Sequence, residues 1–276
     1  MLLHKFARNS YNTTGQKTTG HPAAAYLNVE IFLIYMAFYL SETLSLNDVK
    51  RGFQTPKKSE LLAEFLGILT GDGYANYHPK SKQYRIQITG DSRYDREYLL
   101  NHVNKLINNL FHLKPSFYFK KNQNTMELVI RSKGLFNFLK LTGFKIGKKG
   151  NIGVPEWVLN KHEYMTSFVK GLADTDGCIT LKKRYRTVPY YPAIKIDSIS
   201  HKLMSGVHRW LKNEAELSAI ISSRERFDER WLTATKISCV ELNGVTNLQK
   251  WMAKIGFSNP CKFKKAQKIL NEAGRI

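Results

Sequence analysis

FLGILTGDG (residues 65–73) is an apolar stretch with helical spacing that ends in Gly-Asp-Gly, and VKGLADTDG (residues 169–177) repeats this pattern in the second half of the chain. A helix carries partial negative charge at its C-terminal end, which disfavours an exposed carboxylate there by about 0.3–1 kcal/mol. Asp72 and Asp176 nevertheless occupy these two ends. A helix stop accounts for either acid alone, but a matched pair inside a repeat indicates a site that uses both carboxylates.

Small residues recur at a spacing of four in the two predicted helices, and they are Gly67, Gly71, Gly171 and Thr175. This spacing places them on one face of each helix, and small side chains let two helix backbones approach closely. We therefore expect the helices to pack side by side about a pseudo-twofold axis, with Asp72 and Asp176 emerging together. A divalent cation would reverse the repulsion between these acids, and hard carboxylate oxygens suit Mg²⁺ or Mn²⁺.

Each of these helices is followed by the same predicted order of elements: strand, strand, helix, strand, strand, helix. The predicted strands cover about residues 74–79, 83–89, 115–122, 125–132, 178–186, 191–198, 219–226 and 233–242. The ends of the halves also repeat, since LKLTGFKIGKK (139–149) is similar to MAKIGFSNPCK (252–262). This internal duplication predicts an N-terminal arm and helical extension over 1–58, a first half over 59–154 and a second half over 155–276.

The segment before the first half is predicted to be irregular over residues 1–22 and helical over residues 29–44, where it is apolar nearly all round. SLNDVKRGF (45–53) predicts a turn and a second, short helix. Two helices and a turn in a basic chain permit a helix-turn-helix, but a structural cap on a larger body is the favoured interpretation. Glu64 then lies near the start of the first motif helix, where an acid suits the positive helix end.

The charge balance predicts a polyanionic partner. Lys and Arg total 43 residues against 22 Asp and Glu, which gives a formal net charge of +21. The excess is spread over all three predicted segments, so it is not the property of a basic tail. The three cysteines are far apart and form no Cys-x-x-Cys motif, which argues against a disulfide framework or a zinc site.

No secretory signal with a small-residue cleavage site is recognised in the sequence. The most apolar window, residues 23–40, contains Asn28 and Glu30, and a charge inside a membrane span costs about 2.5–3.5 kcal/mol. We therefore expect a buried helix in this window, no membrane partner, and a cytoplasmic, nucleoid-associated protein.

The two quoted stretches resemble the signature helices of the LAGLIDADG homing endonucleases, and the resemblance in motif and element order covers about residues 59–270. It implies a monomeric, two-motif protein of the archaeal type. Its fold would be α+β, with two pseudo-symmetric αββαββα halves whose antiparallel sheets form a saddle over duplex DNA. Its implied activity is that of an intron-encoded, site-specific endonuclease that hydrolyses a long, asymmetric double-stranded DNA site with Mg²⁺ or Mn²⁺ at the interface of the motif helices.

The resemblance also implies metal ligands, namely the acid before the last glycine of each motif and the preceding backbone carbonyl: Asp72, Asp176, Gly71 and Thr175. The acids would be catalytic as well. The first aspartate of the family signature is replaced by Thr70 in one motif and kept as Asp174 in the other. That position is not the metal-binding acid, so we attach little weight to the change.

Relatives carry a catalytic basic residue just beyond the last helix of each half. The matching residues here are Lys148, with Lys149 beside it, and Lys262. Such a lysine would polarise the attacking water or stabilise the pentacovalent phosphate; a phosphate contact or a solvated side chain is the alternative. Some relatives also have a glutamine near the end of the second strand of a half, but 88–91 and 196–199 contain none, which puts a water-positioning role there in doubt.

Exposed alternate positions of the predicted strands suggest DNA readers independently of any family. These positions hold Gln83, Arg85, Gln87, Arg184, Arg186, Lys195, Arg224 and Arg226. Arginine suits guanine and glutamine suits adenine in the major groove. Any one of these residues can instead contact phosphate only, or be solvated.

Two other functions remain open from the sequence. An RNA-binding splicing cofactor, or maturase, on the same fold is the first, although both motif acids are present here. A non-catalytic DNA-binding regulator is the second, and its one supporting feature is the permitted helix-turn-helix over 29–53. We do not expect an intein, because the chain does not start at Cys or Ser and does not end in His-Asn.

Overall fold

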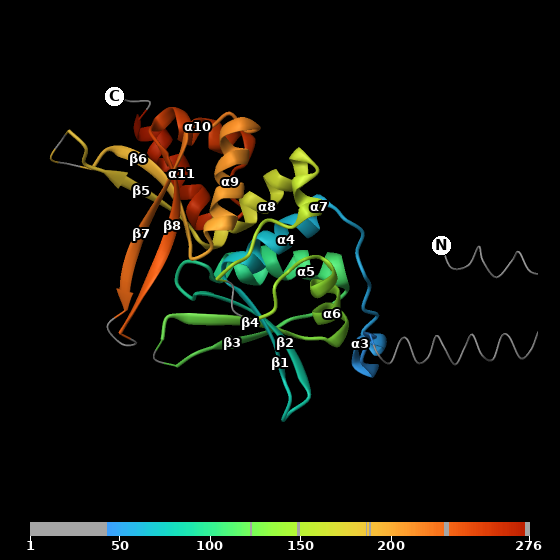
Figure 1. Ribbon diagram of the computed structural model, residues 1–276. Helices are drawn as coiled ribbons and strands as arrows, with labels where there is room; N and C mark the ends of the chain where they lie inside the picture. Colours follow the sequence, from blue (N-terminus) through green and yellow to red (C-terminus); the bar gives the residue numbers. More distant parts are fainter. Residues whose placement is uncertain are drawn as a thin grey trace, which may run out of the picture. The chain divides into compact units, whose positions relative to one another are not determined.

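The computed structural model describes residues 43–121, 123–147, 150–185, 187, 189–228 and 232–273. From Leu46 onward the chain forms one compact unit (Figure 1). Lys148 and Arg186 lie outside the described residues, as do the predicted arm and nearly all of the helix predicted over 29–44. In the part that is described, no helix is both long and apolar enough to span a bilayer.

Two antiparallel sheets of four strands form the framework, which confirms the predicted α+β fold and its repetition. The first sheet has the order β1-β2-β4-β3 and contains β1 (Gly73–His78), β2 (Gln83–Asp91), β3 (Ser116–Phe119) and β4 (Thr125–Arg131). The second has the order β5-β6-β8-β7 and contains β5 (Gly177–Lys182), β6 (Tyr191–Ser198), β7 (Ala219–Asp228) and β8 (Thr233–Asn243). The two sheets therefore share one topology.

The described helices are α3 (Leu46–Lys50), α4 (Glu60–Gly71), α5 (Asn104–Phe111), α6 (Lys133–Leu141), α7 (Glu156–Leu159), α8 (His162–Thr175), α9 (His201–Asn213), α10 (Val245–Lys254) and α11 (Pro260–Ala273). A π-helical turn, η1 (Tyr98–Val103), precedes α5. The sequence did not predict α11. The described residues between α6 and α7 contain no counterpart of it, so the two halves end differently.

Alternation along the strands gives each sheet one buried and one open face. Ile86 and Ile88 of β2 are opposite Ile130 and Leu128 of β4, and all four belong to the core. The matching core residues of the second sheet are Ile194, Ile196, Val240 and Leu242. Helix α6 contacts the first sheet, and α9 and α10 contact the second (Figure 1). Intervening side chains point to the other face of each sheet.

The short helix α3 is attached to the first half through a buried acid. The Oδ2 atom of Asp48 accepts a hydrogen bond from the Gly134 N–H at 3.0 Å, at the start of α6. Leu46 and Val49 of the same helix are 82% and 57% exposed. Helix α3 thus presents its apolar side chains outward.

Candidate active site and nucleic-acid interface

Helices α4 and α8 pack in backbone contact (Figure 1). A Cβ atom added at Gly67 would lie 2.1 Å from the Phe168 carbonyl oxygen. One added at Gly171 would lie 2.3 Å from the Glu64 carbonyl oxygen. Side chains at these two positions would force the helices apart, so the motif glycines set the distance between the helix axes.

The two motif acids stand at the same end of this helix pair. Asp72 caps the C-terminus of α4 and Asp176 that of α8, and both are half-buried. A Cβ atom added at Gly71 would lie 2.0 Å from Thr175 Oγ1 and 3.3 Å from Asp176 Cγ. The Asp176 carboxyl group therefore lies against the last turn of α4, directly beside the residue that precedes Asp72.

Lys262 is bound to the end of α8. Its Nζ atom donates hydrogen bonds to the carbonyl oxygens of Ala173, Asp174 and Thr175 at 2.9, 2.7 and 2.9 Å. An ammonium group has three hydrogens to donate, so these bonds use all of them. The positive charge also offsets the negative end of the helix, where Asp176 stands.

The two motif acids are among the carboxylates whose charge influences the pKa of Lys262. Burial lowers the pKa of Lys262, and the carboxylates of Asp174, Asp72 and Asp176, among others, oppose this without outweighing it. The Thr175 hydroxyl donates to the Gly171 and Leu172 carbonyl oxygens of its own helix at 3.1 and 3.0 Å. The Thr175 carbonyl, a predicted metal ligand, is one of the three that accept from Lys262.

Asp174 is a structural acid. It is 1% exposed, and its carboxylate accepts hydrogen bonds from the N–H groups of Ser258 and Asn259 at 3.0 Å each. These N–H groups immediately precede α11, so Asp174 satisfies donors at the start of that helix. Burial raises the pKa of Asp174 to about 6, although the two backbone hydrogen bonds oppose the shift.

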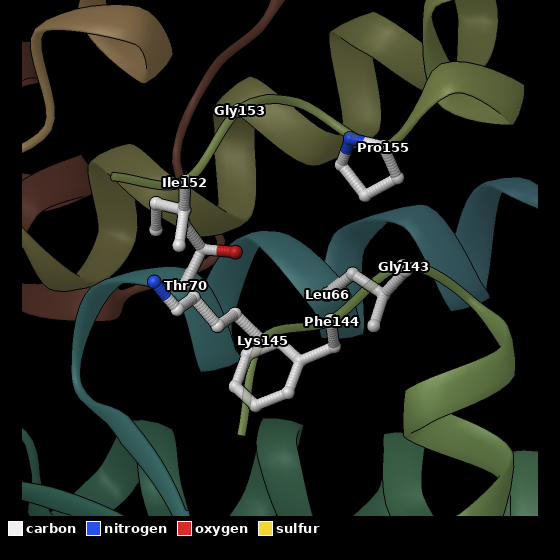
Figure 2. Close-up of a pocket in the computed structure, with 8 residues that line it drawn as sticks. All are labelled: Leu66, Thr70, Gly143, Phe144, Lys145, Ile152, Gly153 and Pro155. Atoms are coloured by element: carbon white, nitrogen blue, oxygen red, sulfur yellow. The ribbon is translucent and has the colours of Figure 1, made fainter. Parts of the chain in front are cut away.

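Thr70 occupies the corresponding position of α4 and faces a different segment of the chain. With Leu66 it lines one side of a cavity of about 10 Å³, opposite residues 143–145, Ile152, Gly153 and Pro155 (Figure 2). Pro155 is the N-cap residue of the short helix α7, whereas Asp174 lies against the start of the much longer α11.

A buried carboxylate near the start of α4 connects the two halves. Glu64 is 3% exposed, and its side chain contacts His102 Nε2 at 2.8 Å, Lys170 Nζ at 3.1 Å and Ser258 Oγ at 2.8 Å. Burial raises the pKa of Glu64, but the hydrogen bond from His102 and the charge of Lys170 lower it. These two effects outweigh burial, so the net shift of the pKa is downward. The position of Glu64 near the start of α4 does not explain its burial. Its contacts with His102, Lys170 and Ser258 do, and they make it a link between the two halves.

The open face of the first sheet carries the candidate readers of β2. Gln83, Arg85 and Gln87 alternate with the buried Ile86 and Ile88, and Gln83 is exposed while the other two are half-buried. Direct cross-strand partners share a face in an antiparallel pair. The same face therefore also holds the partners Tyr74, Asn76, His78, Val129 and Arg131.

The second sheet likewise carries candidate readers on its open face. Lys195 is opposite Glu241, which is opposite Ile220, so alternate residues of β7 after Ile220, including Arg224 and Arg226, share the face of Lys195. Arg184 was predicted within a strand, but β5 ends at Lys182 and Arg184 lies in the turn that follows, with its guanidinium 4.2 Å from the centre of the Tyr191 ring. The described candidates thus divide between two sheets.

Acids on these open faces were not identified from the sequence. Glu127 pairs with Arg85, Glu241 with Lys195, and Asp197 with Arg224 at 2.6 Å. Each acid lies on a strand where apolar and polar residues alternate, and that alternation was the available signal that its side chain lies on the sheet face away from the core. Glu127 is nevertheless only 7% exposed, since its cation partners cover it.

Comparison with known proteins adds a family relationship. A family profile described as "LAGLIDADG-like domain" matches residues 163–256, a range that includes nearly all of α8 and the second sheet. A DNA polymerase of Thermococcus hydrothermalis is 28% identical over 151 residues, which are 54% of this chain and 8% of that protein. An uncharacterized protein of Methanocaldococcus jannaschii is 27% identical over 154 residues, 56% of this chain and 54% of that protein. The chain thus spans about half of one relative and much less of the other.

The solved structures to which the chain is similar include homing endonucleases. I-DmoI in complex with DNA and Mn is 20% identical with a TM-score of 0.45, covering 71% of this chain and 96% of that one. I-DmoI with DNA and Ca is 19% identical with a TM-score of 0.49, covering 77% and 97%. I-WcaI bound to its DNA recognition sequence is 14% identical with a TM-score of 0.48, covering 82% and 91%. The family match includes the second motif and confirms the resemblance there, since residues 163–256 are similar to a LAGLIDADG-like domain.

Proposed function

We propose that the protein is a site-specific endonuclease that hydrolyses both strands of duplex DNA with the help of a divalent metal ion. One observation carries the proposal. Asp72 and Asp176 end two helices that pack in backbone contact, and the Asp176 carboxyl group lies against the last turn of α4, next to Asp72. Carboxylates held together by rigid helices are a ligand set suited to metal-assisted phosphate hydrolysis.

The donor set suits Mg²⁺ or Mn²⁺. Within the described residues, no three His, Cys, Asp or Glu side chains gather as a metal-binding group. Mg²⁺ is commonly held by one or two carboxylates, with water and substrate phosphates completing its shell, so Asp72 and Asp176 are sufficient protein ligands. A bound ion would lower the pKa of its water and stabilise negative charge on the phosphate.

The residues of the chain are proposed to hold the reacting groups in place. Asp72 and Asp176 provide carboxylate oxygens, and the close helix packing sets their separation. Lys262 bonds three carbonyl oxygens at the end of α8, so we propose that it positions Asp176 and is not itself catalytic. Lys148 stays a prediction from the sequence.

Duplex DNA is the proposed partner, with a long and asymmetric site. The net charge of +21 favours a polyanion. The open face of the first sheet offers two glutamines and one arginine from β2, whereas that of the second offers Lys195, Arg224 and Arg226. Different donors on the two faces favour different bases in the two half-sites. Both motif helices come from one chain, so a monomer suffices.

A library of randomised DNA duplexes, incubated in Mg²⁺ or Mn²⁺, tests the proposal. We expect the wild-type protein to cut a defined subset. Asp72→Asn and Asp176→Asn should bind that subset and cut it more than about a hundredfold more slowly, since even indirect supports of a metal site are worth 10–100-fold. Glu60→Gln, an exposed change in the first turn of α4, is the matched control and should cut normally.

Two outcomes would count against the proposal. Near-normal cutting by both aspartate variants would refute the assigned site. Binding of structured RNA without preference for any duplex would favour the maturase alternative.

A further inference from the structure

Each open sheet face contains one carboxylate that is paired with two cations. On the first sheet, Glu127 contacts Arg85 Nη2 at 3.0 Å and Lys120 Nζ at 2.6 Å. We call Arg85, Lys120 and Glu127 the first cluster. The acid belongs to β4, and its partners come from β2 and from the residue that follows β3.

The second cluster consists of Lys182, Lys195 and Glu241. Glu241 pairs with Lys182 and, at 3.3 Å, with Lys195. Here the acid belongs to β8, and the cations come from β5 and β6. Burial raises the pKa of Glu241, but hydrogen bonds from Lys182 and Asn243 and the charge of Lys195 lower it. The net shift of the pKa is downward, so the acid is charged at neutral pH. The same three-charge arrangement therefore occurs on both sheets.

In both clusters the acid is more buried than its cations. The Glu127 and Glu241 side chains are 9% and 17% exposed, whereas those of their four partners are 29–49% exposed. Each cluster keeps a net charge of +1 when all its members are ionised. Negative charge is thus set back from the surface, and two positive groups remain accessible above it.

This arrangement restricts cations that would otherwise move freely. Ordering a lysine or arginine side chain costs up to about 2 kcal/mol of rotamer freedom. A carboxylate that orders the side chain before binding removes part of this cost from the binding step and sets the direction of the donors. An unrestrained cation instead reaches the nearest phosphate, which carries no sequence information.

The first cluster also retains unused hydrogen-bonding capacity. The Nη2 atom of Arg85 contacts Glu127, and the Nε atom is buried, so neither the bonded N–H nor the Nε–H is offered to a ligand. A guanidinium has five N–H groups in a fixed fork, and the Arg85 side chain is 31% exposed. The pairing with Glu127 therefore orients the fork and leaves donors of its terminal nitrogens for a ligand.

We propose that Glu127 and Glu241 are specificity-determining positioning residues, which hold Arg85, Lys182 and Lys195 so that these cations read base edges in duplex DNA. The inference rests on the proposed DNA binding by the sheets. It assigns the acids an indirect role, since they act through the cations that they hold. A neutral amide at either position would release the cations.

The experiment compares Glu127→Gln and Glu241→Gln with the wild-type protein. The probes are the duplex that the wild-type protein enriches most from a randomised library, its single-base variants, and a scrambled duplex of equal composition. Glu225→Gln is the control, because it adds the same charge at an exposed position on the opposite face of β7. Thermal unfolding of each variant verifies that it is folded.

We expect the preference for the enriched duplex over the scrambled one to fall by about 5- to 150-fold in each cluster variant, the range of one base contact. Binding to the scrambled duplex should stay equal or tighten, because a negative charge is lost. The relaxed base pairs should lie in one half-site for Glu127→Gln and in the other for Glu241→Gln. Glu225→Gln should keep its preference.

A double variant separates an indirect role from direct contact. If Glu127 acts through Arg85, then Glu127→Gln combined with Arg85→Met should relax the same base pair by no more than Arg85→Met alone. Additive losses, unchanged preference in both cluster variants, or an equal loss in Glu225→Gln would overturn the inference. Failure of the wild-type protein to enrich any duplex would instead refute the proposed function itself.

Discussion

At the scale of single residues, the internal partners of a charge decide what that charge does. Glu64 lies in a helix of mostly apolar residues and is 3% exposed. An isolated buried carboxylate would be strongly unfavourable. Its cost is offset here because the Glu64 carboxylate contacts His102, Lys170 and Ser258. His102 belongs to the same half as Glu64, and the other two residues belong to the second half. Glu64 is therefore a polar connection inside an interface that is otherwise apolar.

We predict that Glu64→Gln destabilises the protein by about 3 kcal/mol at neutral pH, since removing one partner of a buried ion pair leaves the other charge uncompensated. The folded-state pKa of Glu64 is lowered from 4.5, so the unfolded chain binds the proton more readily. The stabilisation is then complete above pH 4.5 and is lost as the pH falls through the folded-state pKa.

Urea unfolding between pH 3 and pH 8 measures this effect. The difference in unfolding free energy between the wild type and Glu64→Gln should shrink below about pH 4.5, the ordinary glutamate value. Glu60→Gln provides the control in the same helix. A difference that is constant over the whole range would show that lost packing, and not the charge, causes the destabilisation.

At the scale of elements, the α4–α8 pair depends on the absence of side chains at a few positions. A Cβ atom at Gly171 would meet backbone atoms of α4, the Glu64 carbonyl oxygen at 2.3 Å and the Ile68 nitrogen at 3.0 Å. Backbone atoms of a packed helix cannot move aside as a flexible side chain does. Any residue larger than glycine must therefore separate the helices and displace the acids at their ends.

We predict that Gly171→Ala destabilises the protein by about 1–3 kcal/mol, as overpacking does, and also slows DNA cleavage. Gly206→Ala in α9 is the matched control, because its Cβ atom would meet only Val154 Cγ2, at an ordinary 3.5 Å. That change should be neutral or stabilise by up to about 1 kcal/mol, through helix propensity alone. Equal unfolding free energies for the two variants would contradict the account of helix packing.

At the scale of the whole molecule, charge is the property that selects a partner. The excess of 43 basic over 22 acidic residues is spread along the chain. Some of these cations are paired internally, as in the first and second clusters, but each cluster remains positive. A duplex that contacts both open faces would therefore displace many counterions.

We predict that DNA binding weakens steeply with salt. Each neutralised phosphate contributes about −0.9 to the slope of log K against log salt concentration, so contacts from both sheets should give a slope steeper than about −2. Titration of one duplex at several salt concentrations, with cleavage prevented by Asp176→Asn, measures the slope. A shallower slope would mean that only one sheet engages the DNA.

The sequence alone was sufficient to predict the motif helices, the duplication and the eight strands of the two described sheets. These features depend on local periodicity, and the pairing of Gly73 with Ile88 and of Gly177 with Ile196 follows the predicted hairpins. Alternation along β2 also predicted which side of the strand holds Gln83, Arg85 and Gln87. Local patterns carry this information because a helix or strand repeats its geometry every few residues.

Only the tertiary structure decided the roles of the charged residues near the site. Asp174 caps a helix start 84 residues away, Glu64 bonds Ser258 at a separation of 194 residues, and Lys262 bonds the end of α8 at a separation of 88. No spacing in the chain encodes such partners, since they meet only when the halves pack together. The sequence by itself therefore determined the repeated elements and the two aspartates, whereas the packing of α4 against α8 decided which other charges surround them.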